Sequence, residues 1–422
     1  MEKTILHSDL NSFYASVECL YNPRIRDKPV AVCGDPAARH GIVLTKNQIA
    51  KKCGVRTGQA IWQAKQACPQ LVVVKPNYER YLQYSNLARE IYFDYTDRVE
   101  NFGIDEAWLD VTGSSTLFGS GEEIANAIRK RIFSELGVTV SIGVSFCKVF
   151  AKLGSDYKKP DAVTVFSKEN YKEKIWPISV SELLYVGRAT APKLAKCGIY
   201  TIGQLAEFDV NLIYGLLGKV GVLLHQYANG LDYSDVAAND AQGVIKSVGN
   251  SATTHRDLTD EDDVWITLTM LSESVAARLR ENGLKCKTVQ IYLRDKFLIS
   301  CERQAKLPAP SFLSTEIAGL AMEIFRTKYR FIEPLRSIGV RACDLVSENC
   351  AVQMSLLYDY HRQRKMENLE KAIDGIRSRH GHFSIQKGIM LTDRDLSGHN
   401  PKENAIHPVG LLNGPISVQG GF

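Results

Sequence analysis

Stretches of apolar and polar residues divide the chain into regions of different periodicity. Up to about residue 170, short apolar runs of strand type alternate with amphipathic helical stretches, which predicts an α/β or α+β region. The clearest strands are Val30–Cys33, Leu71–Pro76 and Val138–Ser145. Residues 178–233 instead hold short helical segments separated by glycines, which favours a small all-helical domain.

The second half of the chain begins with a polar stretch and then returns to mixed structure. Residues 232–243, DYSDVAANDAQG, have the composition of a linker. Residues 245 to about 348 combine strand patterns in TVQIYLR and RSIGVRACDL with helices near Asp262–Asn282 and Ser314–Tyr329. We therefore expect a further α/β domain after the linker.

The last part of the chain predicts one helix and a flexible tail. Four apolar residues recur at helical spacing and predict an amphipathic helix that docks on another surface: Met366, Leu369, Ile373 and Ile376. From Asp393 onward the sequence is rich in Gly, Pro, Asn and His and has little periodicity, which is typical of a flexible segment.

Composition limits the class of protein. The 422 residues are 45% hydrophobic and 23% charged, and a chain of this length predicts roughly two to four domains. No apolar run approaches the length of a membrane span and the amino terminus carries no signal pattern, which favours a cytoplasmic protein without a membrane partner. The ten cysteines stand singly, which indicates reduced thiols rather than a disulfide or zinc framework.

Positive charge is concentrated locally. The net charge of +5 favours a polyanionic partner only weakly. Between residues 285 and 306, six basic residues face two acidic ones around the alternating Val289, Ile291 and Leu293. This pattern predicts a half-buried strand with a basic outer face suited to phosphates. Taken alone, the segment fits an ordinary solvated sheet face equally well.

Two adjacent acids lie in the otherwise apolar stretch NFGIDEAWLD. Asp105 and Glu106 are costly to bury unless something neutralises them. Asp9 ends the strand-like opening KTILHSDL, and acids that strand ends deliver to one point are suited to magnesium. Adjacent residues of an ideal strand point to opposite faces, so both acids can reach one metal site only through a bulge or a hairpin. An isolated Asp-Glu pair is more often a solvated surface feature.

Three stretches taken together change this interpretation. SDLNSFYASVE, GIDEAWLDV and SIGVSFCKVFAKLGSDYKKP closely resemble the Y family of translesion DNA polymerases, and the resemblance covers most of the chain. It implies that Asp9, Asp105 and Glu106 are catalytic acids that bind two magnesium ions, with the backbone carbonyl of Leu10 as a further ligand.

The resemblance also implies a set of nucleotide-binding residues. Tyr14, beside Phe13, matches the family's steric gate, which would collide with a ribose 2′-hydroxyl; core packing is the alternative. Lys159 matches a lysine that reaches the incoming triphosphate. Where many relatives carry Asn-Tyr-Glu-Ala-Arg, this chain reads KNQIAKK. Thr45 and Lys51 are therefore the expected phosphate contacts, without the bidentate grip of arginine.

Two positions near this set have no single assigned role. Gln48 stands where relatives carry the tyrosine and is a further candidate contact. Gly58 fits a small residue over the nascent base pair and a turn glycine equally well. In the first case the base pair would be loosely enclosed, which lowers fidelity.

The resemblance implies an α+β multidomain protein with the right-hand architecture of polymerases. Its expected parts are the palm at residues 1–18 and 77–170, the fingers at 19–76, the helical thumb at 171–233, a linker at 234–244, the little-finger α/β domain at 245–348, a clamp-binding motif and C-terminal helix at 349–392, and a flexible tail at 393–422.

DNA contacts are expected from the thumb and the little finger. LLYVGRATAPKLAKCG resembles a helix-hairpin-helix, in which amides near Gly187 and Arg188, at the start of the second helix, hold a DNA phosphate without reading bases. In the little finger the basic residues expected to grip the DNA backbone are Lys287, Arg294, Lys296, Arg303, Arg336 and Arg341.

The short motif QMSLL resembles the peptide with which bacterial polymerases dock on the sliding clamp. Gln353 would seek polar partners, and Leu356 and Leu357 would fill an apolar pocket. A turn in the protein core is the alternative interpretation of these five residues.

These features predict a monomeric enzyme for low-fidelity DNA synthesis, which adds deoxynucleotides from dNTPs to the 3′-hydroxyl of primer-template DNA. One rival is an inactive relative that serves as a scaffold for the clamp and DNA. A second is a nucleotidyl cyclase, whose palm carries a comparable acidic hairpin. A cyclase would not need the hairpin-helix and basic domains.

Overall fold

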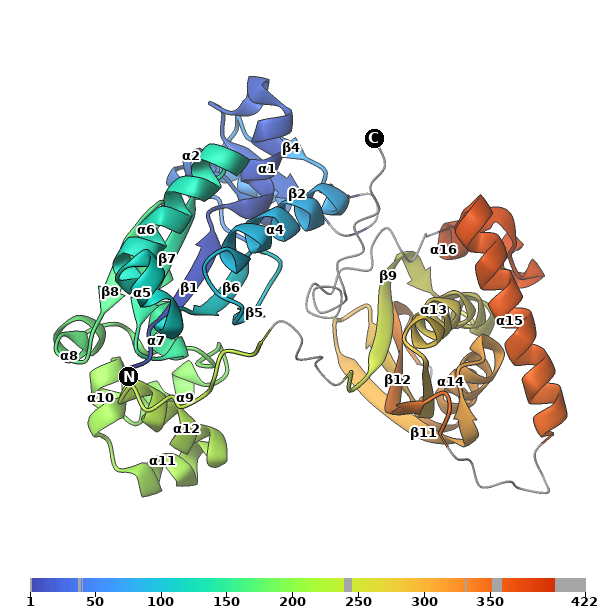
Figure 1. Ribbon diagram of the computed structural model, residues 1–422. Helices are drawn as coiled ribbons and strands as arrows, with labels where there is room; N and C mark the ends of the chain where they lie inside the picture. Colours follow the sequence, from blue (N-terminus) through green and yellow to red (C-terminus); the bar gives the residue numbers. More distant parts are fainter. Residues whose placement is uncertain are drawn as a thin grey trace. The chain divides into compact units, whose positions relative to one another are not determined.

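The computed structural model describes residues 2–36, 39, 41–238, 245–330, 332–350 and 359–398. The described residues up to 238 form one compact unit and those from 245 onward form a second, except that residues 34–36, 39 and 41 group with the second unit (Figure 1). In the described parts of the chain, no helix combines the length and apolar character needed to cross a membrane.

A five-stranded sheet is the centre of the first unit. The strand order is β5-β6-β1-β7-β8, with β1 antiparallel to both β6 and β7, and β7 parallel to β8. The predicted strand at Val138–Ser145 is confirmed as β7. The bounds are β1 Ile5–Leu10, β5 Val99–Asn101, β6 Glu106–Asp110, β7 Val140–Ser145 and β8 Val163–Phe166.

Helices cover both faces of this sheet because the side chains of β1 alternate between them. Leu6 and Leu10 face a core shared with α4 and α6. Ile5 lies on the other face, in a cluster with Trp108 and with Ala151 of α7. The helices are α1 Phe13–Tyr21, α4 Tyr78–Phe93, α5 Ser115–Phe118, α6 Gly121–Arg131 with a π-turn at Ile132–Leu136, and α7 Lys148–Tyr157.

The fingers region contains a small sheet of order β3-β2-β4. Its core includes Ala31, Val43, Ala50 and Ala64. The predicted strands at Val30–Cys33 and Leu71–Pro76 are confirmed. The elements are β2 Val30–Cys33, β3 Val43–Lys46, β4 Val72–Val74, α2 Gln48–Lys52 and α3 Ile61–Ala67.

The border that the sequence placed after residue 18 falls inside a helix. Helix α1 continues to Tyr21, because Cys19 is buried in a cluster with Ile25 and Val30. The same helix therefore carries Tyr14 on the palm and packs against the fingers at its far end.

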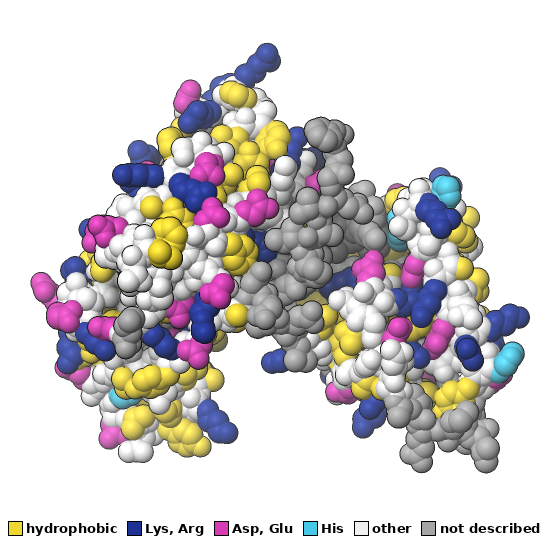
Figure 2. All heavy atoms as spheres, in the orientation of Figure 1, with side chains coloured by type: hydrophobic (Ala, Val, Ile, Leu, Met, Phe, Trp, Pro, Cys, Tyr) yellow, Lys and Arg dark blue, Asp and Glu magenta, His cyan; other side chains and the backbone are white. Residues whose placement is uncertain are grey.

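The thumb region is all-helical, as the glycine-punctuated pattern predicted. Its buried core includes Leu194, Ile202 and Leu224, whereas Leu212 and Tyr214 are exposed. Figure 2 shows hydrophobic side chains gathered over these helices. The helices are α8 Tyr171–Ile175, α9 Ala191–Lys196, α10 Ile202–Glu207, α11 Val210–Leu217 and α12 Lys219–Ala228.

The expected linker at residues 234–244 begins too early. Val236 is buried with Ile5 and Trp108, and the backbone N–H of Ala237 donates to the Glu100 carboxylate over 2.8 Å. This polar stretch thus contains an apolar anchor, Val236. The chain up to residue 237 therefore packs on the first unit rather than serving as a free connection.

The second unit is a four-stranded antiparallel sheet with helices on one face. Its order is β11-β10-β12-β9, and Val289, Ile291 and Leu293 of β10 are buried in the core shared with the helices. The two predicted helices are confirmed as α13 and α14. The bounds are β9 Val248–Leu258, α13 Glu261–Glu281, β10 Leu284–Asp295, β11 Ser300–Ser311, α14 Ser314–Lys328 and β12 Leu335–Ser347.

The C-terminal helix, α15 Tyr360–His380, docks on the second unit, but only part of the predicted apolar stripe is buried. Met366 packs against the core of the second unit, whereas Leu369 and Ile376 are 49% and 41% exposed. Glu370 is buried and pairs with Arg280 of α13. Ion pairs therefore supplement a smaller apolar contact than the one predicted.

The start of the expected flexible tail is also structured. Helix α16, Arg394–Ser397, buries Leu396, and Asp393 pairs with Arg256 over 2.8 Å. Low periodicity concealed this short docked helix. Single-turn 3₁₀ helices complete the described structure at Pro23–Ile25, Thr112–Ser114, Val180–Glu182, His382–Ser384 and Gly388–Leu391.

Candidate active site

The three acids predicted to act together meet at the end of β1. Asp9 and Glu106 are directly opposite each other in the antiparallel β1–β6 pair, so their side chains share one face of the sheet. Asp105 precedes β6, in the hairpin that follows β5, and its carbonyl accepts a hydrogen bond of 3.0 Å from the Leu10 N–H. The hairpin frees Asp105 from the alternation of the strand, so both adjacent acids reach one place.

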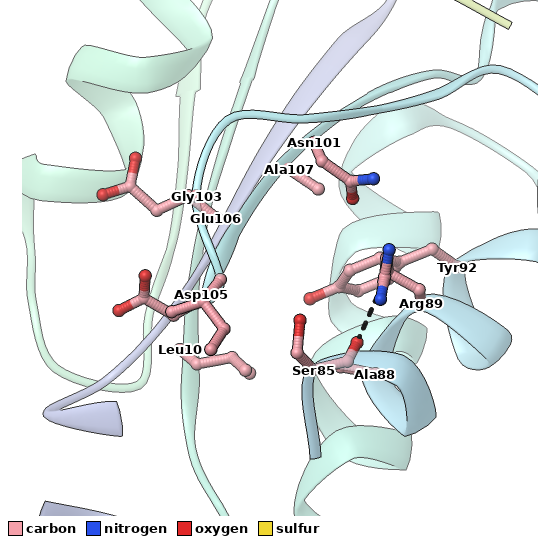
Figure 3. Close-up of a pocket in the computed structure, with 11 residues that line it drawn as sticks. Leu10, Ser85, Ala88, Arg89, Tyr92, Asn101, Gly103, Asp105, Glu106 and Ala107 are labelled. Atoms are coloured by element: carbon pink, nitrogen blue, oxygen red, sulfur yellow. Dashed lines mark hydrogen bonds between the residues drawn. The ribbon is translucent and has the colours of Figure 1, made fainter. Parts of the chain in front are cut away.

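Figure 3 shows this hairpin, with the carboxylates of Asp105 and Glu106 projecting to the same side and Tyr92 of α4 lying on the other. The Phe102 and Gly103 N–H groups both donate to the Glu106 carbonyl, over 3.0 and 3.2 Å. These two bonds hold the turn in the shape that presents both acids together.

Burial and like charge act on these acids together. Burial raises the pKa of Asp9 to about 6 and that of Asp105 to about 7, and the negative charges of Asp9 and Glu106 add to the rise at Asp105. Glu106 behaves differently. Against the effect of burial, His7 and Lys152 lower the pKa of Glu106 to about 2. The cluster therefore contains one firmly ionised acid beside two that resist ionisation.

Two lysines supply the cationic partners. Lys152 of α7 contacts the Glu106 carboxylate. Lys159 Nζ lies 2.5 Å from Asp9 Oδ2 and 2.7 Å from Asp156 Oδ1. Burial disfavours the charge on Lys159, but these two acids outweigh it and raise the lysine pKa to about 12. The lysine that the sequence assigned to a triphosphate is thus bound to acids in this structure.

Two glycines allow α7 to approach the sheet this closely. A Cβ on Gly143 of β7 would lie 1.9 Å from the carbonyl oxygen of Ala151, and one on Gly154 would lie 2.9 Å from the Gly143 Cα. Since neither residue has a side chain, helix and strand backbones are in direct contact. This contact brings Lys152 and Ser155 within reach of β1 and β6.

The donor chemistry of the cluster fits magnesium. Asp9, Asp105 and Glu106 offer only oxygen atoms, which this ion prefers, and the raised pKa of Asp105 indicates a need for positive charge. Among the residues that the structure describes, no three His, Cys, Asp or Glu side chains are already arranged as a metal site. Asp9 and Glu106 have lysines as partners instead, so a metal ion would compete with them.

Tyr14 is held rigidly beside this cluster. Its ring stacks on Tyr81 of α4 with centroids 4.2 Å apart and planes 9° apart. Tyr81 is fixed in turn, because its hydroxyl donates to the Glu18 carboxylate over 2.8 Å. Phe13 is almost fully buried and packs on the same rings. Tyr14 therefore combines core packing on one side with partial exposure on the other.

The fingers residues lie on β3 and α2. Thr45 is opposite Val32 in the β2–β3 pair, and Lys51 is exposed on α2. Gln48 Nε2 donates to Ser12 Oγ over 3.3 Å, which links α2 to the turn before α1. Gly58 has a φ of +78°, a conformation that favours glycine, so its interpretation as a turn residue is confirmed.

Comparisons with known proteins decide the family. Residues 8–156 match the model of the impB/mucB/samB family, and residues 245–356 match the model of that family's C-terminal domain. DNA polymerase IV of Acetivibrio thermocellus is 53% identical over 397 residues, which cover 94% of this chain and all of that protein. DNA polymerase IV of Pelotomaculum thermopropionicum is 37% identical and covers 93% of this chain and 96% of its own length. The chain belongs to the Y family of DNA polymerases.

The fold class of this polymerase is confirmed by a solved structure. The Y-family DNA polymerase chimera Dbh-Dpo4(243-245)-Dbh aligns with a TM-score of 0.72 over 82% of this chain and 99% of its own, at 24% identity. The mixed helix and sheet structure in several domains agrees with the right-hand architecture. The detailed domain borders stay predictions, apart from the three places corrected above.

In the second unit of the polymerase, strand register sorts the basic residues predicted to bind DNA. Arg294 and Gln290 have the same parity on β10, and Arg341 is directly opposite Gln290, so both arginines share the outer face. Arg303 is opposite Ile291, which is fully buried in the helix-covered core. Arg303 therefore points to the other side of the sheet, although the sequence grouped it with the rest.

The other three basic residues lie where the strands are irregular. Lys287 falls at the bulge in β10 and Arg336 at the irregularity in β12. Lys296 lies in the turn after β10 and pairs with Glu333 over 2.7 Å. Alternation does not fix the face of these residues, and their DNA contacts stay predictions.

The thumb loop differs slightly from the expected hairpin. Gly187 and Arg188 lie in an exposed turn before α9, which begins only at Ala191. Within the described part of the chain, the N–H groups of residues 187–189 donate to no protein acceptor. These amides are available to an external acceptor.

Some functional residues were missed, and some lie outside the description. Gln353, Leu356 and Leu357 of the clamp motif fall outside the described residues. His7 and Lys152, which contact Glu106, were not singled out from the sequence. The signal for His7 was available, because a residue two positions before Asp9 on a strand faces the same side.

Proposed function

We propose that this polymerase carries out template-directed, low-fidelity DNA synthesis. The 3′-hydroxyl of a primer attacks the α-phosphorus of a dNTP, and pyrophosphate leaves. The observation that carries this proposal is the meeting of Asp9, Asp105 and Glu106 at the end of β1. The names of the relatives, DNA polymerase IV, support DNA as the product.

Asp9, Asp105 and Glu106, with the Leu10 carbonyl, would hold two magnesium ions. Such a pair, when bound, supplies Lewis-acid activation of the attacking hydroxyl and stabilises charge on the leaving pyrophosphate. The protein's own part is to hold the Asp105 and Glu106 carboxylates on one side of a closed hairpin (Figure 3), with Asp9 opposite Glu106 on β1. No side chain needs to act as a nucleophile.

Lys159 would exchange partners when the nucleotide binds. It pairs with Asp9 and Asp156 in the structure, and its raised pKa keeps it cationic. A triphosphate offers a more concentrated negative charge than these acids, so the ammonium group would move to the phosphates while Asp9 becomes free for metal. Loss of dNTP affinity without loss of DNA affinity in Lys159→Met would support this role; unchanged dNTP affinity would refute it.

Low fidelity would follow from a small and loosely gripping fingers region. Helices α2 and α3 have only five and seven residues. Thr45 and Lys51 would bind phosphate oxygens, but lysine lacks a planar fork. Discrimination would then rest on modest differences in binding. An error frequency as low as that of a replicative polymerase on undamaged template would contradict this proposal.

Tyr14 would act as the steric gate against ribonucleotides. Its stacking on Tyr81 prevents the ring from moving aside, which makes collision with a 2′-hydroxyl costly. Tyr14→Ala should therefore accept ribonucleotides at least about tenfold better, which corresponds to roughly 1.4 kcal/mol. Unchanged sugar selectivity would remove the gate.

DNA would be held by backbone contacts in the thumb and the little finger. The amides around Gly187 and Arg188, which have no acceptor among the described residues, suit a phosphate. Arg294 and Arg341 lie together on the outer face of the second sheet. QMSLL would add a clamp contact. Deletion of the QMSLL motif should leave primer extension in the absence of the clamp unchanged. It should remove the stimulation of extension by the clamp.

Primer extension tests the proposal as a whole. We propose that the protein acts as a monomer in the cytoplasm. It should extend a primer on both damaged and undamaged templates when dNTPs and magnesium are present. DNA binding without extension would favour the scaffold. Formation of cyclic nucleotide from a triphosphate in the absence of DNA would favour the cyclase.

A further inference from the structure

His7 occupies the inner side of the acidic cluster. It lies two residues before Asp9 on β1, is fully buried, and packs edge-on against Trp108 with ring centroids 5.2 Å apart. One ring nitrogen, Nδ1, is 2.8 Å from Ser155 Oγ. The other, Nε2, is 3.3 Å from Glu106 Oε2. The ring therefore connects α7 to a proposed metal ligand.

If the side chain at position 7 only filled space in the core, a hydrocarbon side chain would be more stable there. His7 Nε2 makes no hydrogen bond of ordinary geometry within the described part of the chain, and a buried polar atom without a full partner costs about 1–3 kcal/mol. The atom is aimed at Glu106 rather than at the core. This unfulfilled contact points to a role in the orientation of that carboxylate.

The proton of Ser155 decides which ring nitrogen of His7 carries hydrogen. The hydroxyl lies 2.8 Å from His7 Nδ1 and 2.8 Å from the Lys152 carbonyl, but it has one proton to donate. Donation to Lys152 would put the ring proton on Nδ1 and leave a bare Nε2 lone pair facing the Glu106 carboxylate. Donation to Nδ1 puts the proton on Nε2, where it can serve Glu106.

We propose that His7 is a positioning residue for Glu106, with its Nε2–H directed at the carboxylate by the Ser155 hydroxyl. This inference rests on the proposed function, because it assumes that Glu106 binds metal. Glu106 Oε2 is then shared by His7 and Lys152, and Oε1 stays available to a cation.

The position of His7 beside Ser155 also depends on the close approach of helix α7 to strand β7. Ser155 reaches His7 only because Gly143 and Gly154 let the helix lie on β7. Partners behind metal ligands commonly change metal affinity by about 10- to 100-fold when they are removed. We expect a loss in that range for His7→Leu.

Direct Mn²⁺ binding, followed by electron paramagnetic resonance with primer-template DNA and dNTP present, tests the inference. His7→Gln places an amide donor near the former Nε2, and His7→Asn places one near the former Nδ1. Gln should retain most Mn²⁺ affinity, while Asn and Leu should lose it. Ser155→Ala should show a smaller loss. A role confined to core packing would affect Gln and Asn alike and would refute the proposal.

Ser145→Ala is the matched control. Ser145 is a buried serine of the same sheet whose hydroxyl donates to the Phe166 carbonyl over 2.8 Å, away from the acids. It should keep parental Mn²⁺ affinity. Thermal melting and DNA binding of each variant report folding. If His7→Leu does not fold, the contrast between Gln and Asn decides, and equal affinities in that pair overturn the inference.

Failure of the inference and failure of the proposed function look different. If the parental protein extends primers and binds Mn²⁺ but His7→Asn matches it, the polymerase stands and the positioning role falls. If the parental protein neither extends primers nor binds Mn²⁺, the metal assignment itself is wrong.

Discussion

Asp105 in the first unit and Asp263 at the start of α13 in the second are both shielded carboxylates, yet their pKa values move in opposite directions. The Arg256 guanidinium lowers the pKa of Asp263 despite burial. Burial and two neighbouring acids raise the pKa of Asp105 to about 7. One acid has its countercharge built into the fold, and the other lacks it. A shielded acid of the second kind marks a candidate functional site, and our proposal is that an external cation supplies the missing charge.

The docking of α15 gives a larger example of shielded acids that have a cationic partner within the fold. Arg280 of α13 binds Glu370 and makes a bidentate pair with Asp374, over 2.5 and 2.8 Å. Glu370 also accepts from the Ser314 N–H and hydroxyl at the start of α14. Here both acids have a guanidinium partner within the fold, and the network joins three elements. Stability, rather than chemistry, is the expected product of such pairing.

The largest effect should come from removing an acid of the candidate active site. Asp105→Ala and Glu106→Ala should each slow primer extension by more than about a thousandfold, because a metal ligand is lost. Asp105→Ala should not lower the free energy of unfolding, since it relieves repulsion from Asp9. Single-turnover extension and denaturant melts measure the two effects, and DNA binding should persist. Full activity in either variant would contradict the proposed role of that acid in extension.

The opposite result is expected for a balanced charge. Arg280→Met leaves Glu370 buried without its cation and should cost about 3–5 kcal/mol in the free energy of unfolding of the second unit. Catalytic chemistry in the first unit should be spared. Arg326→Met is the control, because its pair with Glu261 is exposed and should contribute less than about 1 kcal/mol. Equal destabilisation by both variants would contradict this account.

Sequence reasoning found the strands and helices because their periodicity reflects burial. Val30–Cys33 and Val138–Ser145 were recognisable since core-facing strands are apolar. The docking of α15 could be predicted only in part in this way. Met366 of the apolar stripe does pack on the core, but the buried residues of the helix are Gln363 and Glu370, and Arg280, the partner of Glu370, is distant in sequence. Periodicity reports apolar contacts, and it does not report contacts made through polar and charged side chains.

The acids of the site were predictable, but their support was not. Resemblance to a family identified Asp9, Asp105 and Glu106 from their local motifs. The hairpin that brings Asp105 beside Glu106, and the glycine contact that brings Lys152 to them, depend on tertiary packing. His7 was missed because a histidine on an apolar strand reads as core until its neighbours are known.

A smaller effect, stabilisation of the first unit by magnesium, should test directly whether a metal ion supplies the positive charge that the acids lack. Magnesium at about 10 to 100 times its dissociation constant should stabilise the first unit by roughly 1–3 kcal/mol, because it binds only the folded acids. Melting curves with magnesium and with chelator measure this shift. Asp9→Ala should remove it, whereas Asp393→Ala, which disturbs a balanced pair in the second unit, should keep it. A shift that survives Asp9→Ala would place the ion elsewhere.

The smallest predicted effect separates two arginines by strand register alone. Arg341 shares the outer face of the second sheet with Arg294, while Arg303, opposite buried Ile291, points to the other side. If the outer face meets a DNA phosphate, Arg341→Ala should reduce the slope of log affinity against log salt by about 0.9. Arg303→Ala, with the same loss of net charge, should leave the slope unchanged. Because the two variants alter overall charge equally, a difference between them reports geometry, and equal slopes would mean that the DNA contact does not follow this face of the sheet.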